Sequence, residues 1–175
     1  MLDSLRLAKE YDFKSVVRLV NEAYRPIAGN EGWTHESNFI NGDRISYSQL
    51  NEIFLRINSL VLVGLLNEKI IACVHIEKKK EASYIGMLAV APVCQGMGIG
   101  KEMLLNAERY ADLYFNSIKY SMMVVSRRQE LINFYLRCGY QKTGIVEDFP
   151  VNANVGNPTI QNIQIEKLEK IRVKL

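Results

Sequence analysis

The chain has 175 residues, of which 48% are hydrophobic and 23% are charged. That length predicts a single domain over residues 1–175, and that balance excludes an intrinsically disordered chain. Twenty-two lysines and arginines against nineteen aspartates and glutamates leave a net charge of +3, which suits an anionic small molecule but is too small to indicate nucleic-acid binding.

The N-terminal part of the chain predicts one short strand and two helices. Leu2–Ala8 has the pattern of a strand, and Asp12 is the expected N-cap of the helix after it. The loop of residues 27–45 is long for a compact domain, so we expect it to be functional or mobile. Ser46 and Gln49 have the spacing of a capping box, which predicts the start of a second helix. The apolar positions of the first helix share one face: Phe13, Val16, Val17, Val20, Ala23 and Tyr24.

A hairpin and a strand–helix–strand unit are predicted in the middle of the chain. Residues 60–66 and 70–76 are rich in β-branched and other apolar residues and are joined by a short turn, which favours an antiparallel hairpin. A strand at 82–91, a helix at 98–115 and a strand at 119–125 follow. Two strands that a helix connects in this way require a parallel pair in the sheet.

The last part predicts a helix over residues 129–138, ended by Gly139, and strands over residues 140–146 and 159–168. The complete order is βααβββαβαββ. We therefore expect an α/β (α+β) chain, with a mixed, mostly antiparallel central sheet and helices on both faces.

The strongest chemical signal is a glycine-rich segment between a strand and the long helix, Gln95-Gly96-Met97-Gly98-Ile99-Gly100-Lys101. Glycine lets a ligand approach the backbone, and the first turn of a helix leaves its amides unpaired, so the segment predicts a phosphate site. The alternative is a turn that only packs the helix against the sheet.

Two common phosphate-binding motifs do not fit this segment. A Walker A loop would need glycine at Gln95 and a hydroxyl residue at Glu102. The dinucleotide fingerprint would need glycine at Lys101 or at Met103, and it belongs to the first strand–helix turn. Both readings are therefore rejected.

The segment does match the pattern Q/R-x-x-G-x-G/A, and it strongly resembles the acyl-CoA loop of the GNAT superfamily of N-acetyltransferases. Residues 128–140 resemble that family's later N-x-x-x-Y-x-x-x-G-[FY] pattern, although Asn133 and Tyr135 are closer together here than in some members. The element order also agrees, so the resemblance covers essentially the whole chain. It implies the GNAT fold and transfer of an acetyl group from acetyl-CoA to a primary amine of a small molecule or peptide. A catalytically silent acyl-CoA-binding or regulatory domain is the alternative.

The resemblance also implies which residues bind the coenzyme. Main-chain amides around the glycine loop would hold its pyrophosphate, and the pantetheine would pair with a strand edge at Leu88, Ala89 and Val90. The N–H of Leu88 would polarise the thioester carbonyl, and Gly86 is the expected position of a bulge that opens the strands. The implied loop residues are Gln95, Gly96, Met97, Gly98, Ile99, Gly100 and Lys101. The Lys101 side chain either faces the ribose phosphate or is solvated.

By the same resemblance, Tyr135 would give a proton to the leaving thiolate, and its alternative is an ordinary core tyrosine. Asn133 would bind the pantetheine arm or cap the preceding loop. On the acceptor side, Trp33 and Glu36 lie in the 27–45 loop, where an aromatic ring and a carboxylate suit a cationic amine; the alternative is a tryptophan that packs the loop down. Four candidates remain for the general base: Glu36, His75, Glu147 and Asp148.

The three cysteines, Cys73, Cys94 and Cys138, are widely spread and fit neither a disulfide framework nor a zinc site, so we expect a cytoplasmic protein without metal. The start of the sequence has no signal-peptide pattern, and no stretch has the length and apolar character of a membrane span. Homodimers are common in the family that the sequence resembles, but the sequence identifies no interface.

Overall fold

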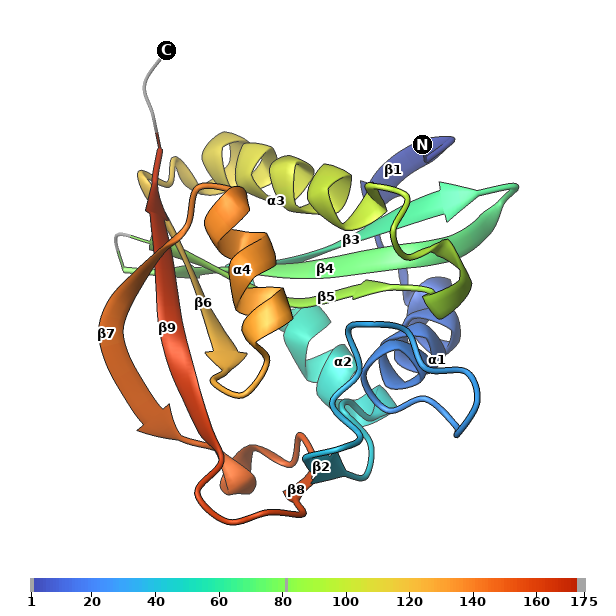
Figure 1. The fold of residues 1–175 in the computed structure, drawn as a ribbon. Helices are drawn as coiled ribbons and strands as arrows, with labels where there is room; N and C mark the ends of the chain where they lie inside the picture. The colour runs from blue at the N-terminus through green and yellow to red at the C-terminus, as the bar shows by residue number, and fades with distance from the viewer. Residues whose placement is uncertain (1, 81, 173–175) are drawn as a thin grey trace.

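The computed structural model describes residues 2–80 and 82–172, and its centre is a seven-stranded sheet of order β1-β3-β4-β5-β6-β9-β7 (Figure 1). Neighbouring strands pair antiparallel except β5 and β6, which are parallel. This confirms the predicted mixed, mostly antiparallel sheet. The strands are β1 Ser4–Leu7, β3 Ser59–Leu66, β4 Lys69–Lys79, β5 Ala82–Val90, β6 Lys119–Val125, β7 Gln141–Asp148 and β9 Gln164–Ile171.

Four helices cover the two faces of the sheet, as the sequence predicts. They are α1 Phe13–Tyr24, α2 Tyr47–Leu55, α3 Ile99–Phe115 and α4 Gln129–Arg137. Buried residues of α1 and α2, such as Val20 and Leu50, pack in one cluster with strand residues. Buried residues of α3 and α4, such as Met103 and Ile132, form the larger cluster on the opposite face. No helix among the described residues has the length and hydropathy needed to cross a membrane.

The predicted start of α2 is correct in atomic detail, and α1 begins directly after Asp12 as predicted, but the Asp12 side chain does not cap it. Ser46 Oγ accepts from the Gln49 amide at 3.2 Å, and Gln49 Oε1 accepts from the Ser46 amide at 2.8 Å. Asp12 makes no such cap to α1. Its buried carboxylate instead accepts from Arg6 Nη1 at 2.6 Å and from the Lys9 amide at 2.8 Å. The Arg6 guanidinium and the Lys9 amide therefore bind the Asp12 carboxylate in place of the first amides of α1.

The strand predicted from Thr159 begins only at Gln164. Residues 159–163 form turns, and Asn162 has a φ of +56°, which a strand does not accommodate. Two short strands were not predicted: β2, Ile40–Asn41, and β8, Asn157–Pro158, pair antiparallel. Their two-residue length leaves no periodicity to detect, yet they fasten the 27–45 loop to the C-terminal part of the chain.

Strands β5 and β6 separate soon after they begin, and this separation positions the site. They pair only at Ala82, Ser83 and Tyr84, after which β6 continues against β9. On the other side of β5, Met87 and Leu88 together lie opposite the single residue Val74 of β4, which makes a bulge. The sequence analysis expected this bulge at Gly86. It lies instead at Met87 and Leu88, and Met87 has a positive φ of +52°. The β5 edge that faces β6 is thus open around Leu88.

Candidate active site

Two cavities lie next to the opened strands and share part of their walls. The glycine-loop cavity, of about 280 Å³, is bounded by the loop before α3 and by Trp33, Val90 and Phe134. The arginine cavity, of about 240 Å³, is bounded by Arg44, Arg128 and the separated strands. The residues that line both are Tyr24, Leu88, Arg128, Leu131 and Tyr135. Molecules bound in the two cavities would therefore meet beside these five side chains.

The glycine loop presents unpaired main-chain amides to its cavity. Gly96 and Gly98 have φ values of +79° and +81°, and a Cβ built on either would meet nothing within 4 Å. The Glu102 amide bonds to the Gly98 carbonyl at 3.1 Å, whereas the amides of residues 96–101 have no main-chain acceptor in the described part of the chain. With the positive end of the α3 dipole added, this arrangement is suited to binding an anion.

Not every residue predicted around the glycine loop lines the cavity. Gln95, Gly96, Gly98, Gly100 and Lys101 do. The Met97 side chain is 61% exposed, and Ile99 is buried in the core below α3. Ala89 points to the opposite face of the sheet, where it packs with the α1 cluster.

The Gln95 side chain connects the glycine loop to two other segments. Its Nε2 donates to Thr34 Oγ1 at 2.8 Å and to the Val90 carbonyl at 3.0 Å. Gln95 therefore joins the glycine loop to the 27–45 loop and to the end of β5. Its buried Oε1 has no partner among the described residues.

Tyr135 lies where the two cavities meet. Its ring packs edge-on against Phe134, with ring centroids 5.2 Å apart, and against Tyr140 at 6.0 Å. Burial raises the pKa of the Tyr135 phenol well above its usual value, so the hydroxyl stays protonated at neutral pH. Asn133, two residues earlier on α4, is exposed and lines neither cavity.

A second tyrosine at the junction was missed by the sequence analysis. Tyr24 was assigned only to the core face of α1, but its hydroxyl donates to the Leu88 carbonyl at 3.2 Å. Burial is the main reason that the pKa of Tyr24 rises to about 12. The only available signal was its place at the C-terminal end of α1, immediately before the long loop. Tyr24 thus holds the bulged part of β5 from the α1 side.

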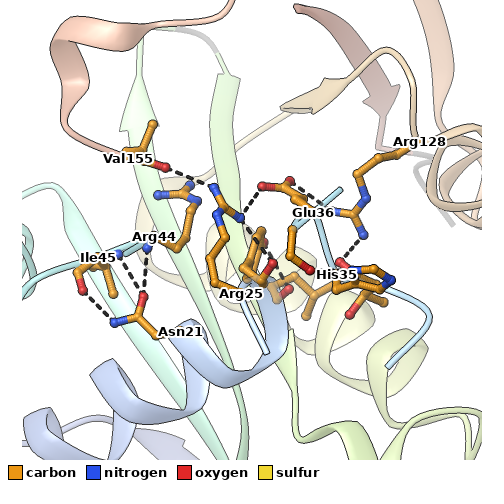
Figure 2. Close-up of polar contacts among 12 residues, drawn as sticks. Asn21, Arg25, His35, Glu36, Arg44, Ile45, Arg128 and Val155 are labelled. Atoms are coloured by element: carbon orange, nitrogen blue, oxygen red, sulfur yellow. Dashed lines mark hydrogen bonds and ion pairs between the residues drawn. The ribbon is translucent and has the colours of Figure 1, made fainter. Parts of the chain in front are cut away.

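Glu36 is buried between two arginines (Figure 2). Its Oε2 accepts from Arg25 Nη1 at 2.6 Å, and its Oε1 accepts from Arg128 Nη1 at 2.9 Å. Arg128 also donates to the Thr34 carbonyl, and Arg25 Nη2 donates to the Val155 carbonyl at 3.1 Å. Both carboxylate oxygens are therefore engaged, and the cluster pins a loop that was expected to be functional or mobile.

Replacing Glu36 by alanine is expected to lower the free energy of unfolding by about 3–5 kcal/mol, because it leaves two buried arginines without their counter-ion. Urea denaturation followed by circular dichroism measures this change. The matched control is Glu22→Ala on the surface of α1, where an exposed pair with Arg18 spans 3.7 Å and contributes less than about 1 kcal/mol. Equal losses in the two variants would contradict the structural role assigned to Glu36.

Trp33 was expected on the acceptor side together with Glu36, but its ring faces the glycine loop. It packs edge-on against Phe134, with centroids 6.0 Å apart, and lines the glycine-loop cavity while remaining 48% exposed. The two side chains therefore lie at different places: Glu36 is bound to the buried arginines, and Trp33 lines the glycine-loop cavity.

The remaining candidates for a general base lie outside both cavities. His75 is buried on β4, with Nε2 2.7 Å from Ser59 Oγ. Glu147 and Asp148 are exposed on β7, although the next residues, Phe149 and Pro150, line the arginine cavity. Within residues 2–80 and 82–172, no group of three His, Cys, Asp or Glu side chains could hold a metal ion.

His75 instead makes stability depend on pH. Burial lowers the pKa of His75 from 6.5 to about 4, so below pH 6.5 the unfolded chain takes up a proton that the folded chain excludes. Stability therefore falls as pH falls from about 6.5 to 4, and the histidine alone accounts for about 2 kcal/mol between pH 7 and pH 5. Urea denaturation at both pH values should show a smaller difference in His75→Gln. An unchanged difference would contradict this assignment.

Comparisons with known proteins agree with this fold. The sequence model of the acetyltransferase (GNAT) family matches residues 14–140. No curated protein sequence gives a significant match. Many solved structures are similar, among them smu.2055 from Streptococcus mutans, with 16% identity, a TM-score of 0.75, and coverage of 96% of this chain and 98% of that one.

Two further solved structures carry functional names. The paia N-acetyltransferase of Thermoplasma acidophilum, solved in complex with coenzyme A, has 16% identity and a TM-score of 0.70, over 97% of this chain and 98% of that one. A spermidine N-acetyltransferase SpeG chimera from Vibrio cholerae and hSSAT has 18% identity and a TM-score of 0.69, over 96% and 94%. Together with the glycine loop and the separated strands, the match over residues 14–140 leads to one conclusion: the chain belongs to the acetyltransferase (GNAT) family.

Proposed function

We propose that the protein transfers an acetyl group from acetyl-CoA to a primary amine by direct attack in a ternary complex. The observation that carries this proposal is the meeting of two cavities at Leu88 and Tyr135, beside an open strand edge. One cavity has the anion-binding amides that a coenzyme diphosphate needs. The other is lined by the separated strands and meets the first at the same junction, so it suits the amine.

On the donor side, the diphosphate binds the main-chain amides of residues 96–101. Met97 and Ile99 contribute only their main-chain N–H groups and not their side chains. The pantetheine arm continues along the open edge of β5 past Val90 and Leu88, as an added strand does. Trp33 and Phe134 cover this arm. Lys101, exposed at the start of α3, faces the phosphates at the cavity mouth.

In the reaction, the neutral amine nitrogen attacks the thioester carbon, and a C–N bond forms as the carbonyl oxygen becomes an oxyanion. The Leu88 N–H on the bulge donates to that oxygen, a contribution of about 2.7–4 kcal/mol in other acyl-transfer sites. The C–S bond then breaks, and the sulfur takes the proton of the Tyr135 hydroxyl. The nitrogen loses its extra proton to water, and water returns a proton to the phenolate.

The test is a titration with acetyl-CoA followed by thiol release with a panel of primary amines. Binding together with amine-dependent thiol release, and with acetylated amine seen by mass spectrometry, is the expected result. Binding without transfer to any amine would indicate the silent coenzyme-binding domain instead. Absence of acetyl-CoA binding would overturn both functions.

A further inference from the structure

The arginine cavity has no carboxylate available for a cationic substrate. The charged residues that line it are Glu36, Arg44 and Arg128, and the glycine-loop cavity adds only Lys101. Both Glu36 oxygens are already bound to buried arginines. In the described part of the chain, the charge that these walls offer to a ligand is therefore positive.

Arg44 is the arginine of this cavity that has no anionic partner among the described residues. The Asn21 side chain fixes its main chain at the end of the long loop, because Asn21 Oδ1 accepts from the Arg44 amide at 2.8 Å and from the Ile45 amide at 3.1 Å. The Arg44 guanidinium lies 5.4 Å from the centre of the Tyr24 ring and is half-buried. The ring and the turn thus hold a cation at the cavity wall.

A second arginine lies next to it. Figure 2 shows the Arg44 side chain beside that of Arg25. Burial, and after it the charge of Arg44, lower the pKa of the Arg25 guanidinium, while Glu36 opposes them. The Arg25 Nε is buried and has no partner among the described residues. Glu36 is shared between Arg25 and Arg128, so the neighbouring guanidinium of Arg44 leaves this end of the cavity short of negative charge.

We propose that the acceptor amine also carries an oxyanion, a carboxylate or a phosphate, and that Arg44 binds it. Guanidinium groups bind both anions through paired N–H donors, which a polyamine cannot use. Tyr24 fixes the geometry, since its ring lies under Arg44 and its hydroxyl reaches the Leu88 carbonyl at the reaction junction. The same side chain thus contacts both Arg44 and the reaction junction, an arrangement that fits one small molecule carrying an amine and an oxyanion.

The same charges assist the chemistry. A protonated amine cannot attack, and arginines nearby disfavour the ammonium form of any bound amine. A cationic cavity therefore supplies neutral amine without a carboxylate base, consistent with the absence of a free base among the lining residues. A polyamine would instead bring further ammonium groups against Arg44 and Arg128.

This inference rests on the proposed function, and a panel of matched amines tests it. Glycine, β-alanine and L-glutamate are each compared with their carboxamides, phosphoethanolamine is compared with ethanolamine, and spermidine represents polycations. At least tenfold higher kcat/KM for the oxyanion member of a pair is expected. The carboxylate and phosphate pairs distinguish the two anions.

Variants assign the effect to Arg44. In Arg44→Gln the preference should disappear, while Arg44→Lys should keep part of it and the affinity for acetyl-CoA should not change. Arg18→Gln, an exposed arginine of α1, is the control and should behave as wild type. Equal or better transfer to the neutral amines or to spermidine, or a preference that survives in Arg44→Gln, would overturn the inference alone. No transfer to any amine would count against the proposed function.

Discussion

Gly98→Val is expected to weaken acetyl-CoA binding by about 100-fold or more. The φ of +81° at Gly98 lies in the left-handed region, where a β-branched residue costs about 1–2 kcal/mol. A Cβ at this position would project into the open space that the diphosphate needs. Two lost amide–phosphate hydrogen bonds, each about 1.5–3 kcal/mol, account for a change of that size. Isothermal titration with acetyl-CoA measures it.

The control for this variant is Gly144→Val. Gly144 has nearly the same φ, +82°, and nothing within 4 Å of a built Cβ, but it lies on exposed β7, away from both cavities. It should cost similar stability with no effect on coenzyme affinity. If the two variants bind acetyl-CoA equally well, the glycine loop is not the binding site.

Tyr135→Phe is expected to lower kcat by about 100-fold or more with little change in acetyl-CoA affinity, because the variant lacks the proposed general acid while the ring and its packing remain. Tyr135 lines both cavities, and its hydroxyl, kept protonated by burial, is the proposed proton donor at their junction. Steady-state kinetics at saturating amine and titration with acetyl-CoA separate the two effects.

A second tyrosine variant shows whether the loss of a hydroxyl from the core is enough to produce this result. The Tyr120 hydroxyl donates to Asp112 at 2.6 Å and lines neither cavity, so Tyr120→Phe should lose stability but keep its kcat. Wild-type turnover in Tyr135→Phe would reduce that residue to core packing. A thousandfold loss of coenzyme affinity would equally contradict its assigned role.

Local patterns predicted most of the fold. Apolar periodicity and end signals such as Gly139 located α1 to α4, and the capping box of Ser46 and Gln49 placed the start of α2 correctly. The position of the glycine loop directly before α3 was also predicted, because glycine-rich segments and helix starts are local patterns. These features depend on neighbours within a few residues, and that information is contained in a single sequence.

Contacts between distant segments were not predictable in the same way. Glu36 was interpreted as a ligand for a cationic amine, but Arg25 and Arg128 occupy both of its oxygens. Arg128 lies 92 positions further along the chain, and no periodicity links residues so far apart. The same reason explains why Tyr24 at the junction and the β2–β8 pairing were missed. Which partner neutralises a buried charge is decided only when the fold brings the segments together.

The position of β9 has a consequence for the order in which the protein is built. This strand lies between β6 and β7, although it follows β7 in the chain. During synthesis on the ribosome, residues 141–148 emerge before β9, the strand with which they pair in the described part of the chain. In a nascent chain that ends before Gln164, the edge of β7 that will pair with β9 is therefore still unpaired. The contacts of Arg128 with Glu36 and of Val155 with Arg25 then form before the sheet is complete. We expect the arginine cavity, whose wall includes Ile165 of β9, to be completed late in biosynthesis, after this last strand has been inserted.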